Sequence, residues 1–158
     1  MKFILALNPK DPAIKGYESD LLKMIQIMDK REATYWKESA NLDILSREME
    51  CKTLEERWVD DTQILMLLVR GNPVGFVEYT TAVVNASSKW LSICYLYVQR
   101  EYRGFGYGSA LVDQVRNFAK IQQVDQLSLS VKSRNKRAIK FYKRYGFSEQ
   151  TKYFCMKP

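Results

Sequence analysis

The sequence contains no histidine among its 158 residues. This absence excludes nucleophiles activated by histidine, such as Ser–His and Cys–His pairs, and every histidine-ligated metal site. Any general base must therefore be a carboxylate, a tyrosine, a lysine or a water held by other groups. The three cysteines, Cys51, Cys94 and Cys155, have neither metal-ligand spacing nor the pattern of a disulfide framework. We expect no metal and reduced thiols.

Long apolar runs are also missing. The apolar stretch at residues 3–7 is shorter than the ~7–15 residues of a signal-peptide core, and no run approaches the ~20 residues of a membrane span. Internal repeats and Pro/Gly/Ser-rich linkers are missing too. These absences predict a cytoplasmic protein without a membrane partner, folded as one domain over residues 1–158.

The charge that is present is unevenly divided. Residues 1–99 hold 12 Lys and Arg against 14 Asp and Glu (12 − 14 = −2), and residues 100–158 hold 13 against 4 (13 − 4 = +9). A basic half suits a polyanionic ligand and an acidic half suits a cationic one. A solvated basic surface and a nucleic-acid partner explain the same charge, so the motifs must separate these alternatives.

Hydrophobic periodicity predicts a mixed α/β sheet with helices on both faces. Strands are expected at 2–7, 62–70, 74–84, 90–98 and 126–131, with one or two closing strands within 147–156; helices are expected at 17–30, 42–57, 108–122 and 135–145. The turn at 71–73 makes the second and third strands a hairpin.

A glycine-rich turn lies between the predicted strand at 90–98 and the predicted helix at 108–122. It consists of Arg103, Gly104, Phe105, Gly106, Tyr107, Gly108 and Ser109. Glycines allow close backbone approach, and the free N–H groups of the helix start then form an anion site. The dinucleotide-binding fingerprint would need glycine at 109, and no P-loop is present. A purely structural turn would not need three glycines.

The turn resembles the acetyl-CoA motif of the GNAT superfamily of N-acetyltransferases. That motif is an arginine or glutamine, a glycine three residues later, and a glycine or alanine two further on, as at Arg103, Gly106 and Gly108. A second family element is similar to residues 135–147, where Asn135 is followed at the family's spacing by alanine, two aromatic residues and Gly-Phe. Together the two elements cover residues 90–147, and the order of elements agrees as well.

The resemblance implies a GNAT fold with a splayed parallel strand pair, and acetyl-CoA as co-substrate. Pantetheine would lie along Leu96, Tyr97 and Val98, and the turn from Arg103 to Ser109 would hold the pyrophosphate. Asn135 would cap its helix and also contact the cofactor; capping alone is the alternative. The nearby basic residues Arg134, Lys136, Arg137 and Lys140 would meet the nucleotide phosphates or simply face solvent.

The resemblance also implies Tyr142 as the acid that protonates the departing thiolate, whereas its helical spacing alone favours an aromatic core residue. Glu78, a lone carboxylate on an apolar strand, is the candidate base or amine binder. Solvent exposure of Glu78 and a water relay are the alternatives. Without a histidine to activate Cys94, we expect direct attack by the amine and no acetyl-enzyme.

The expected reaction is N-acetylation of a primary amine. Acidic residues crowd positions 43–61, which favours a small cationic acceptor over a protein or peptide N-terminus. A non-catalytic CoA-binding regulatory module is a second hypothesis. A nucleic-acid-binding domain is a third, and the sequence carries no motif for it. Both a monomer and a homodimer remain open.

Overall fold

The computed structural model describes residues 1–37, 51–58, 61–85 and 88–151. The strands are β1 (Lys2–Ala6), β2 (Thr62–Val69), β3 (Asn72–Asn85), β4 (Ser88–Val98) and β5 (Gln126–Leu129). The helices are α1 (Glu18–Lys37), α3 (Leu54–Arg57), α4 (Tyr107–Ile121) and α5 (Lys136–Tyr145), with short 3-10 turns η1 (Pro12–Ile14) and η2 (Arg100–Tyr102).

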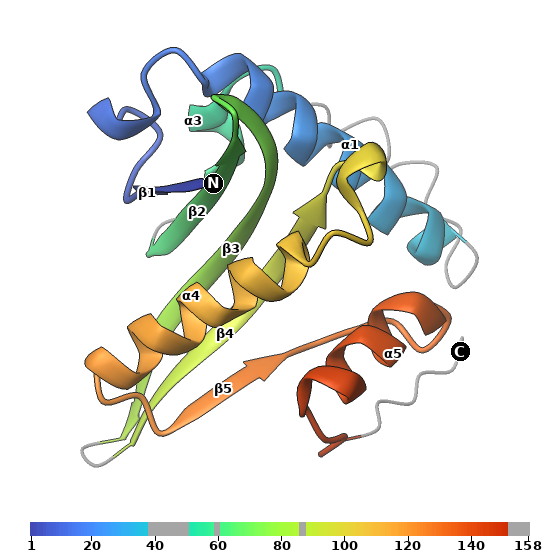
Figure 1. The fold of residues 1–158 in the computed structure, drawn as a ribbon. Helices are drawn as coiled ribbons and strands as arrows, with labels where there is room; N and C mark the ends of the chain where they lie inside the picture. The colour runs from blue at the N-terminus through green and yellow to red at the C-terminus, as the bar shows by residue number, and fades with distance from the viewer. Residues whose placement is uncertain (38–50, 59–60, 86–87, 152–158) are drawn as a thin grey trace.

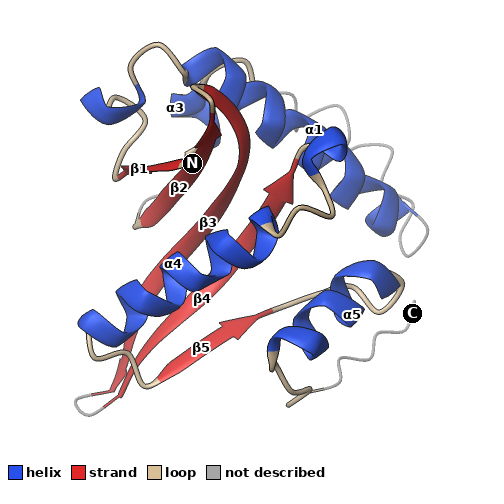
Figure 2. Ribbon diagram, in the orientation of Figure 1, coloured by secondary structure: helices blue, strands red, loops and turns tan. Residues whose placement is uncertain are grey.

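The described strands form one sheet in the order β1-β2-β3-β4-β5. The first four are antiparallel neighbours, and β5 pairs with β4 in parallel. Figure 1 shows the long β3–β4 hairpin crossing the molecule, with α4 in front of it and α1 behind. Figure 2 shows helices on both sides of the sheet, which confirms the predicted mixed α/β architecture.

Alternating residues of the strands supply two apolar layers. On one face, Ile4, Met66 and Phe76 pack against the apolar stripe of α1. On the other, Leu67, Val77 and Leu91 pack against α4, with Phe141 and Tyr145 of α5 at the margin. Because successive strand residues point to opposite faces, this dense apolar alternation requires cover on both sides.

Several expected boundaries differ from the structure. The first helix continues past 30 to Lys37, because residues 31–37 contain no helix breaker even though the apolar period ends. Of the helix expected at 42–57, only Leu54–Arg57 is helical in the described residues, and positions 42–50 lie outside them. Thr53 starts that turn by accepting a hydrogen bond from the Glu56 amide at 3.2 Å. Residues 147–151 form no strand, and 152–156 lie outside the described residues.

Gly75 sets the closest contact between β3 and the end of β4. A Cβ atom at this position would lie 2.5 Å from the Tyr97 carbonyl oxygen and 3.2 Å from the Val98 Cα. The Gln99 amide donates to the Val74 carbonyl at 2.9 Å just beyond, so the strand end cannot move away freely. Glycine is required here by the lack of space.

We therefore expect Gly75→Ala to lower the free energy of unfolding by about 1–3 kcal/mol, the usual effect of overpacking. Urea unfolding followed by circular dichroism measures it. Gly108→Ala is the matched control, since its Cβ would meet Phe141 at an ordinary 3.7 Å. The control should be neutral or slightly stabilising; equal losses in both variants would contradict the steric argument.

Candidate active site

The strands β4 and β5 separate part of the way along their length. They pair only from Trp90 to Ile93 and from Gln126 to Leu129, whereas β4 continues to Val98. Figure 1 shows the two strands side by side at one end and diverging toward the other. Beyond Ile93, β4 has no strand partner on this side among the described residues. Its backbone groups can therefore pair with a ligand carrying amides, and Leu96, Tyr97 and Val98 lie on this segment.

A β-bulge marks the point of divergence. Tyr95 lies opposite Glu78 and Ile93 lies opposite Tyr79, so Cys94 is the extra residue of β4. A bulge bends its strand and redirects the backbone groups next to it. Burial raises the pKa of the Cys94 thiol, with a further contribution from Glu78. The thiol is thus a poor nucleophile, which favours direct attack by a substrate amine.

The glycine-rich turn leads from the end of β4 into α4. Gly104 and Gly106 have φ of +90° and +81°, a conformation that disfavours side chains. Gly106 is the residue before α4, and no side chain caps the helix there. The N–H groups of Tyr107, Gly108 and Ser109 stand in the first turn, where no intrahelical partner exists. Together with the positive end of the helix dipole, N–H groups in this position can bind phosphate oxygens.

Arg103 fixes the start of this turn. Its Nε donates to the Val98 carbonyl oxygen at 2.7 Å, and its guanidinium lies 5.8 Å from the centre of the Tyr97 ring. The guanidinium of Arg31, from α1, lies 6.0 Å from the same ring. Burial lowers the pKa of Arg103, and the nearby charges of Arg31, Arg137 and Arg100 lower it further. Four arginines therefore gather where a polyanion would neutralise them.

Arg31 is a residue that sequence reasoning missed, because it belongs to a helix more than sixty positions from the turn. Phe105, at the tip of the turn, is 71% exposed.

Asn135 caps α5: its side-chain oxygen accepts a hydrogen bond from the Ala138 amide at 3.1 Å, which confirms the capping role.

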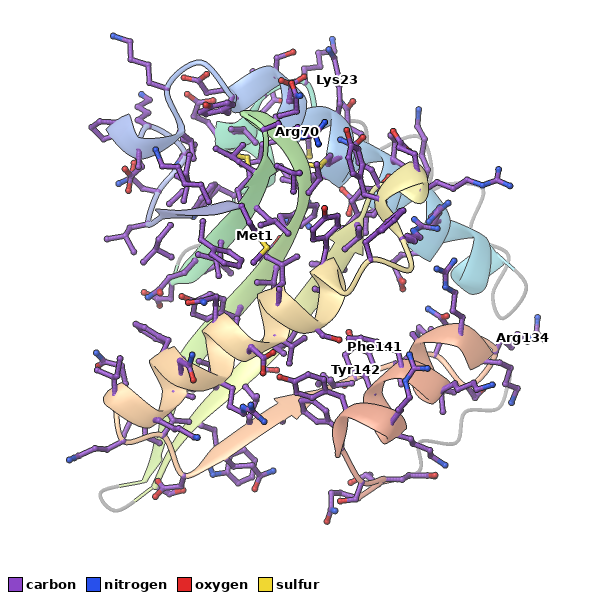
Figure 3. All side chains as sticks on the ribbon, viewed as in Figure 1. Met1, Lys23, Arg70, Arg134, Phe141 and Tyr142 are labelled. Atoms are coloured by element: carbon purple, nitrogen blue, oxygen red, sulfur yellow. The ribbon has the colours of Figure 1, made fainter. Side chains whose placement is uncertain are left out.

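Tyr142 lies on α5 beside Phe141 (Figure 3). Its ring meets Phe141 and Phe147 edge-on, with centroid distances of 5.1 Å and 5.6 Å. Burial raises the pKa of Tyr142 to about 12, and the charge of Glu32 on α1 adds to the effect. The phenol therefore keeps its proton at neutral pH.

The Tyr142 and Tyr145 hydroxyls differ in what they contact. Tyr145 donates to the Asp113 carboxylate on α4, and Arg116 lies over its ring at 5.5 Å. Within the described part of the chain, the Tyr142 hydroxyl makes no hydrogen bond. Tyr145 is thus a structural residue that joins α5 to α4, while the Tyr142 hydroxyl is available to a ligand.

Glu78 is buried, with 2% exposure, so the alternative of a solvent-exposed strand end is wrong. It lies on the face covered by α1, and Nη2 of Arg57 on α3 reaches its carboxylate at 3.5 Å. Burial raises the pKa of Glu78; Arg57 opposes that rise and Asp29 on α1 adds to it. A carboxylate whose pKa is raised is a stronger base than an exposed one, and this one lies opposite the bulge.

The structure thus brings Glu78, the bulge and the unpaired end of β4 to one level of the sheet. Glu32 of α1 acts on the pKa of both Tyr95 and Tyr142, which shows that α1, β4 and α5 converge there. Sequence reasoning also missed Asp29 and Arg57. Asp29 carried a usable signal: it follows Ile25 by four residues, and so falls on the apolar face of the helix.

The described residues contain no cluster of side chains suited to a metal ion, and no helix among them has the length and apolarity to cross a membrane. A hollow of about 720 Å³ lies between residues 9–22 and 52–55. None of the candidate site residues lines it.

Residues 28–147 match the family model described as Acetyltransferase (GNAT) family. An uncharacterized N-acetyltransferase of Methanocaldococcus jannaschii is 34% identical over 93 residues, which cover 58% of this chain and 41% of that protein. The chain thus spans about two fifths of the length of this curated relative.

Solved structures share the fold at low sequence identity. The tetramutant of the BH1408 protein from Bacillus halodurans has a TM-score of 0.77 at 16% identity, covering 100% of both chains. A ribosomal-protein-alanine N-acetyltransferase from Brucella melitensis biovar Abortus has 0.65 at 18%, covering 99% of both. An aminoglycoside acetyltransferase from an uncultured soil sample has 0.65 at 18%, covering 100% of this chain and 99% of that one. On the family match and this shared fold, the chain belongs to the GNAT family of acetyltransferases.

Proposed function

We propose that the protein transfers an acetyl group from acetyl-CoA to a primary amine by direct attack, with a small cationic amine as acceptor. The observation that carries this proposal is the end of the β4–β5 pairing at Ile93, beside the bulge at Cys94. Over residues 94–98, β4 stays paired with β3 but has no strand partner on its other side among the described residues. A ligand that pairs with that backbone would supply the hydrogen bonds that its free N–H and C=O groups lack.

The residues around the divergence suit acetyl-CoA in both shape and charge. Leu96, Tyr97 and Val98 offer backbone groups to the two amides of pantetheine. The N–H groups of Tyr107 and the following residues offer an anion site to the pyrophosphate. The arginines around Tyr97, at positions 31, 100, 103 and 137, supply positive charge to the same end.

Acetyl-CoA supplies a thioester, from which the amine takes the acetyl group while the thiol leaves. Glu78, directly or through a water, takes the proton that the acceptor ammonium must lose before attack. Tyr142, on the opposite side of the gap, gives its proton to the leaving sulfur. The second proton, which the nitrogen loses as the amide forms, returns to the tyrosinate directly or through water. A backbone N–H at 94–96 donates to the thioester oxygen.

Three carboxylates support a cationic acceptor: Asp29, Glu32 and Glu78 all influence the pKa of Tyr95 and so surround one point. Of the acidic stretch at 43–61, Asp43, Glu48, Glu50 and Asp60 lie outside the described residues, while Glu55 and Glu56 are exposed. One fold relative acts on an aminoglycoside and another on a ribosomal protein, so the fold suits either acceptor class.

A panel of acceptors decides between these classes. Acetyl-CoA consumption is measured against aminoglycosides, linear polyamines and peptides with free α-amino groups at pH 7.5. We expect turnover with the small polycationic amines. Turnover confined to peptides would assign a protein N-terminus instead. CoA binding without turnover on any amine would favour the regulatory module.

Asn135 separates capping from cofactor contact. Asn135→Ala should lower the free energy of unfolding by about 1 kcal/mol, because the Ala138 amide loses its partner. Asn135→Ser keeps the cap and shortens the side chain. If Asn135 also contacts the cofactor, calorimetry will show weaker acetyl-CoA binding in both variants. Full affinity in the serine variant would leave Asn135 with capping alone.

Tyr142→Phe should lower kcat by about 10²–10⁴-fold, the usual contribution of a positioned general acid. Its thermal stability should hardly change, because no hydrogen bond to the described residues is lost. Tyr145→Phe is the matched control: it loses the bond to Asp113, which should cost about 1 kcal/mol of stability and leave kcat intact.

Both measurements belong on the same samples, at saturating acetyl-CoA and acceptor. Because the pKa of Tyr142 is about 12, the wild-type rate should show no loss from its ionisation below about pH 11. A phenylalanine variant at position 142 that keeps most of its rate would make Tyr142 a core aromatic, with the thiol protonated from solvent.

A further inference from the structure

Three charged side chains from three different elements meet beneath the bulge. Asp29 comes from α1, Arg57 from α3 and Glu78 from β3, with side-chain exposures of 8%, 13% and 3%. Buried charges of this kind are costly unless they are paired, and here one cation serves two carboxylates. The arrangement has a net charge of −1, which packing of the three elements alone does not require.

The two contacts of Arg57 are unequal. Its Nε donates to Asp29 at 3.1 Å, whereas its Nη2 reaches Glu78 at 3.5 Å, the outer limit of a hydrogen bond. The guanidinium is therefore held mainly by Asp29. Glu78 experiences the positive charge without the short, two-pronged contact that would make it a very weak base.

The Tyr95 ring provides a further contact that restrains the Arg57 guanidinium. The Arg57 guanidinium lies 5.2 Å from the centre of the Tyr95 ring, within the range of a cation–π contact. Tyr95 is the cross-strand partner of Glu78 and follows the bulge residue Cys94 directly. A guanidinium held by Asp29 and by this ring has little freedom, so its charge stays at one place relative to the Glu78 carboxylate.

We propose that Arg57 and Asp29 are positioning residues for Glu78: Asp29 anchors the guanidinium, and the guanidinium orients the carboxylate and sets its basicity. This inference rests on the proposed role of Glu78 as proton acceptor and adds the device that tunes it. Neither residue needs to touch a substrate. Their effect is that Glu78 remains ionised in a buried place, yet retains its affinity for a proton.

Arg57 and Asp29 have opposite effects on the pKa of Glu78. Among the described residues, the groups that face it are Arg57 from α3, Asp29 from α1, and Cys94 and Tyr95 from β4. Burial is the largest cause that raises the pKa of Glu78; Arg57 lowers it and Asp29 raises it. Loss of Arg57 must therefore move the pKa of Glu78 up, and loss of Asp29 must move it down.

The experiment is the pH dependence of kcat at saturating acetyl-CoA and acceptor, where the acidic limb reports groups of the bound complex. Arg57→Met should move the midpoint of that limb to higher pH by about one unit or more. Asp29→Asn should move it to lower pH. Arg57→Lys keeps the charge, so the midpoint of its acidic limb should return most of the way to the wild-type value. Its kcat should stay reduced.

Arg116→Met is the matched control. This arginine also pairs with a carboxylate, Asp113 at 2.9 Å, and lies over a tyrosine ring, yet it is far from Glu78 in the fold. The acidic limb of Arg116→Met should have the same midpoint as that of the wild type. Shifts of the same sign in the Arg57 and Asp29 variants, or unshifted midpoints in folded samples of both, would overturn the positioning role and leave an ion cluster that only joins elements.

Glu78→Gln distinguishes failure of this inference from failure of the proposed function. It should abolish the acidic limb and leave acetyl-CoA affinity unchanged. If the limb persists in Glu78→Gln, Glu78 is not the proton acceptor and the proposed role itself fails. If the acidic limb disappears in Glu78→Gln but its midpoint is unshifted in the Arg57 and Asp29 variants, only the positioning role fails. Should Arg57→Met not fold, the downward shift in Asp29→Asn decides alone.

Discussion

The one-residue β-bulge at Cys94 in β4 is the constraint on which the rest of the site depends. With Cys94 unmatched opposite β3, the strand bends at the point where its parallel neighbour stops pairing. Among the described residues, the last residues of β4 are then paired with β3 on one side only. Buried N–H and C=O groups do not stay unpaired without cost, so this segment gains most from a ligand that supplies hydrogen bonds.

Both faces of the sheet hold that gap in place. α1 covers one face and α4 the other. α5 joins α4 through the bond of Tyr145 with Asp113 and through Phe141, which packs against the apolar cluster that α4 shares. Gly75 keeps the end of β4 against β3, so the strand departs from β5 and not from the rest of the sheet. The glycines near the gap therefore serve different physical needs. Gly104 and Gly106 provide positive φ, whereas Gly75 provides space.

Charge is arranged along the gap in the same order as the proposed substrates. Arginines gather around Tyr97, next to the turn where phosphates would lie. Carboxylates gather around Tyr95, two residues back along β4, where an acceptor ammonium would approach. Opposite charges only two strand residues apart would keep an anionic cofactor and the proposed cationic acceptor in separate places. α1 contributes to both groups, with Arg31 in the first and Asp29 and Glu32 in the second.

The sequence alone was sufficient for the order of most strands and helices, the glycine-rich turn at the start of α4, the cap at Asn135 and the family. These depend on neighbours in the chain: apolar periodicity, glycine at a helix start, and a side chain that reaches an amide three residues on. Only the tertiary structure decided that Glu78 is buried, that Asp29 and Glu78 share Arg57, and that Arg31 stands beside Arg103. Those facts depend on which elements pack together, and on a bulge whose position follows from strand pairing. No local pattern of residues encodes a contact between a helix at 18–37 and a turn at 103–109, because that contact exists only once the sheet has brought them together.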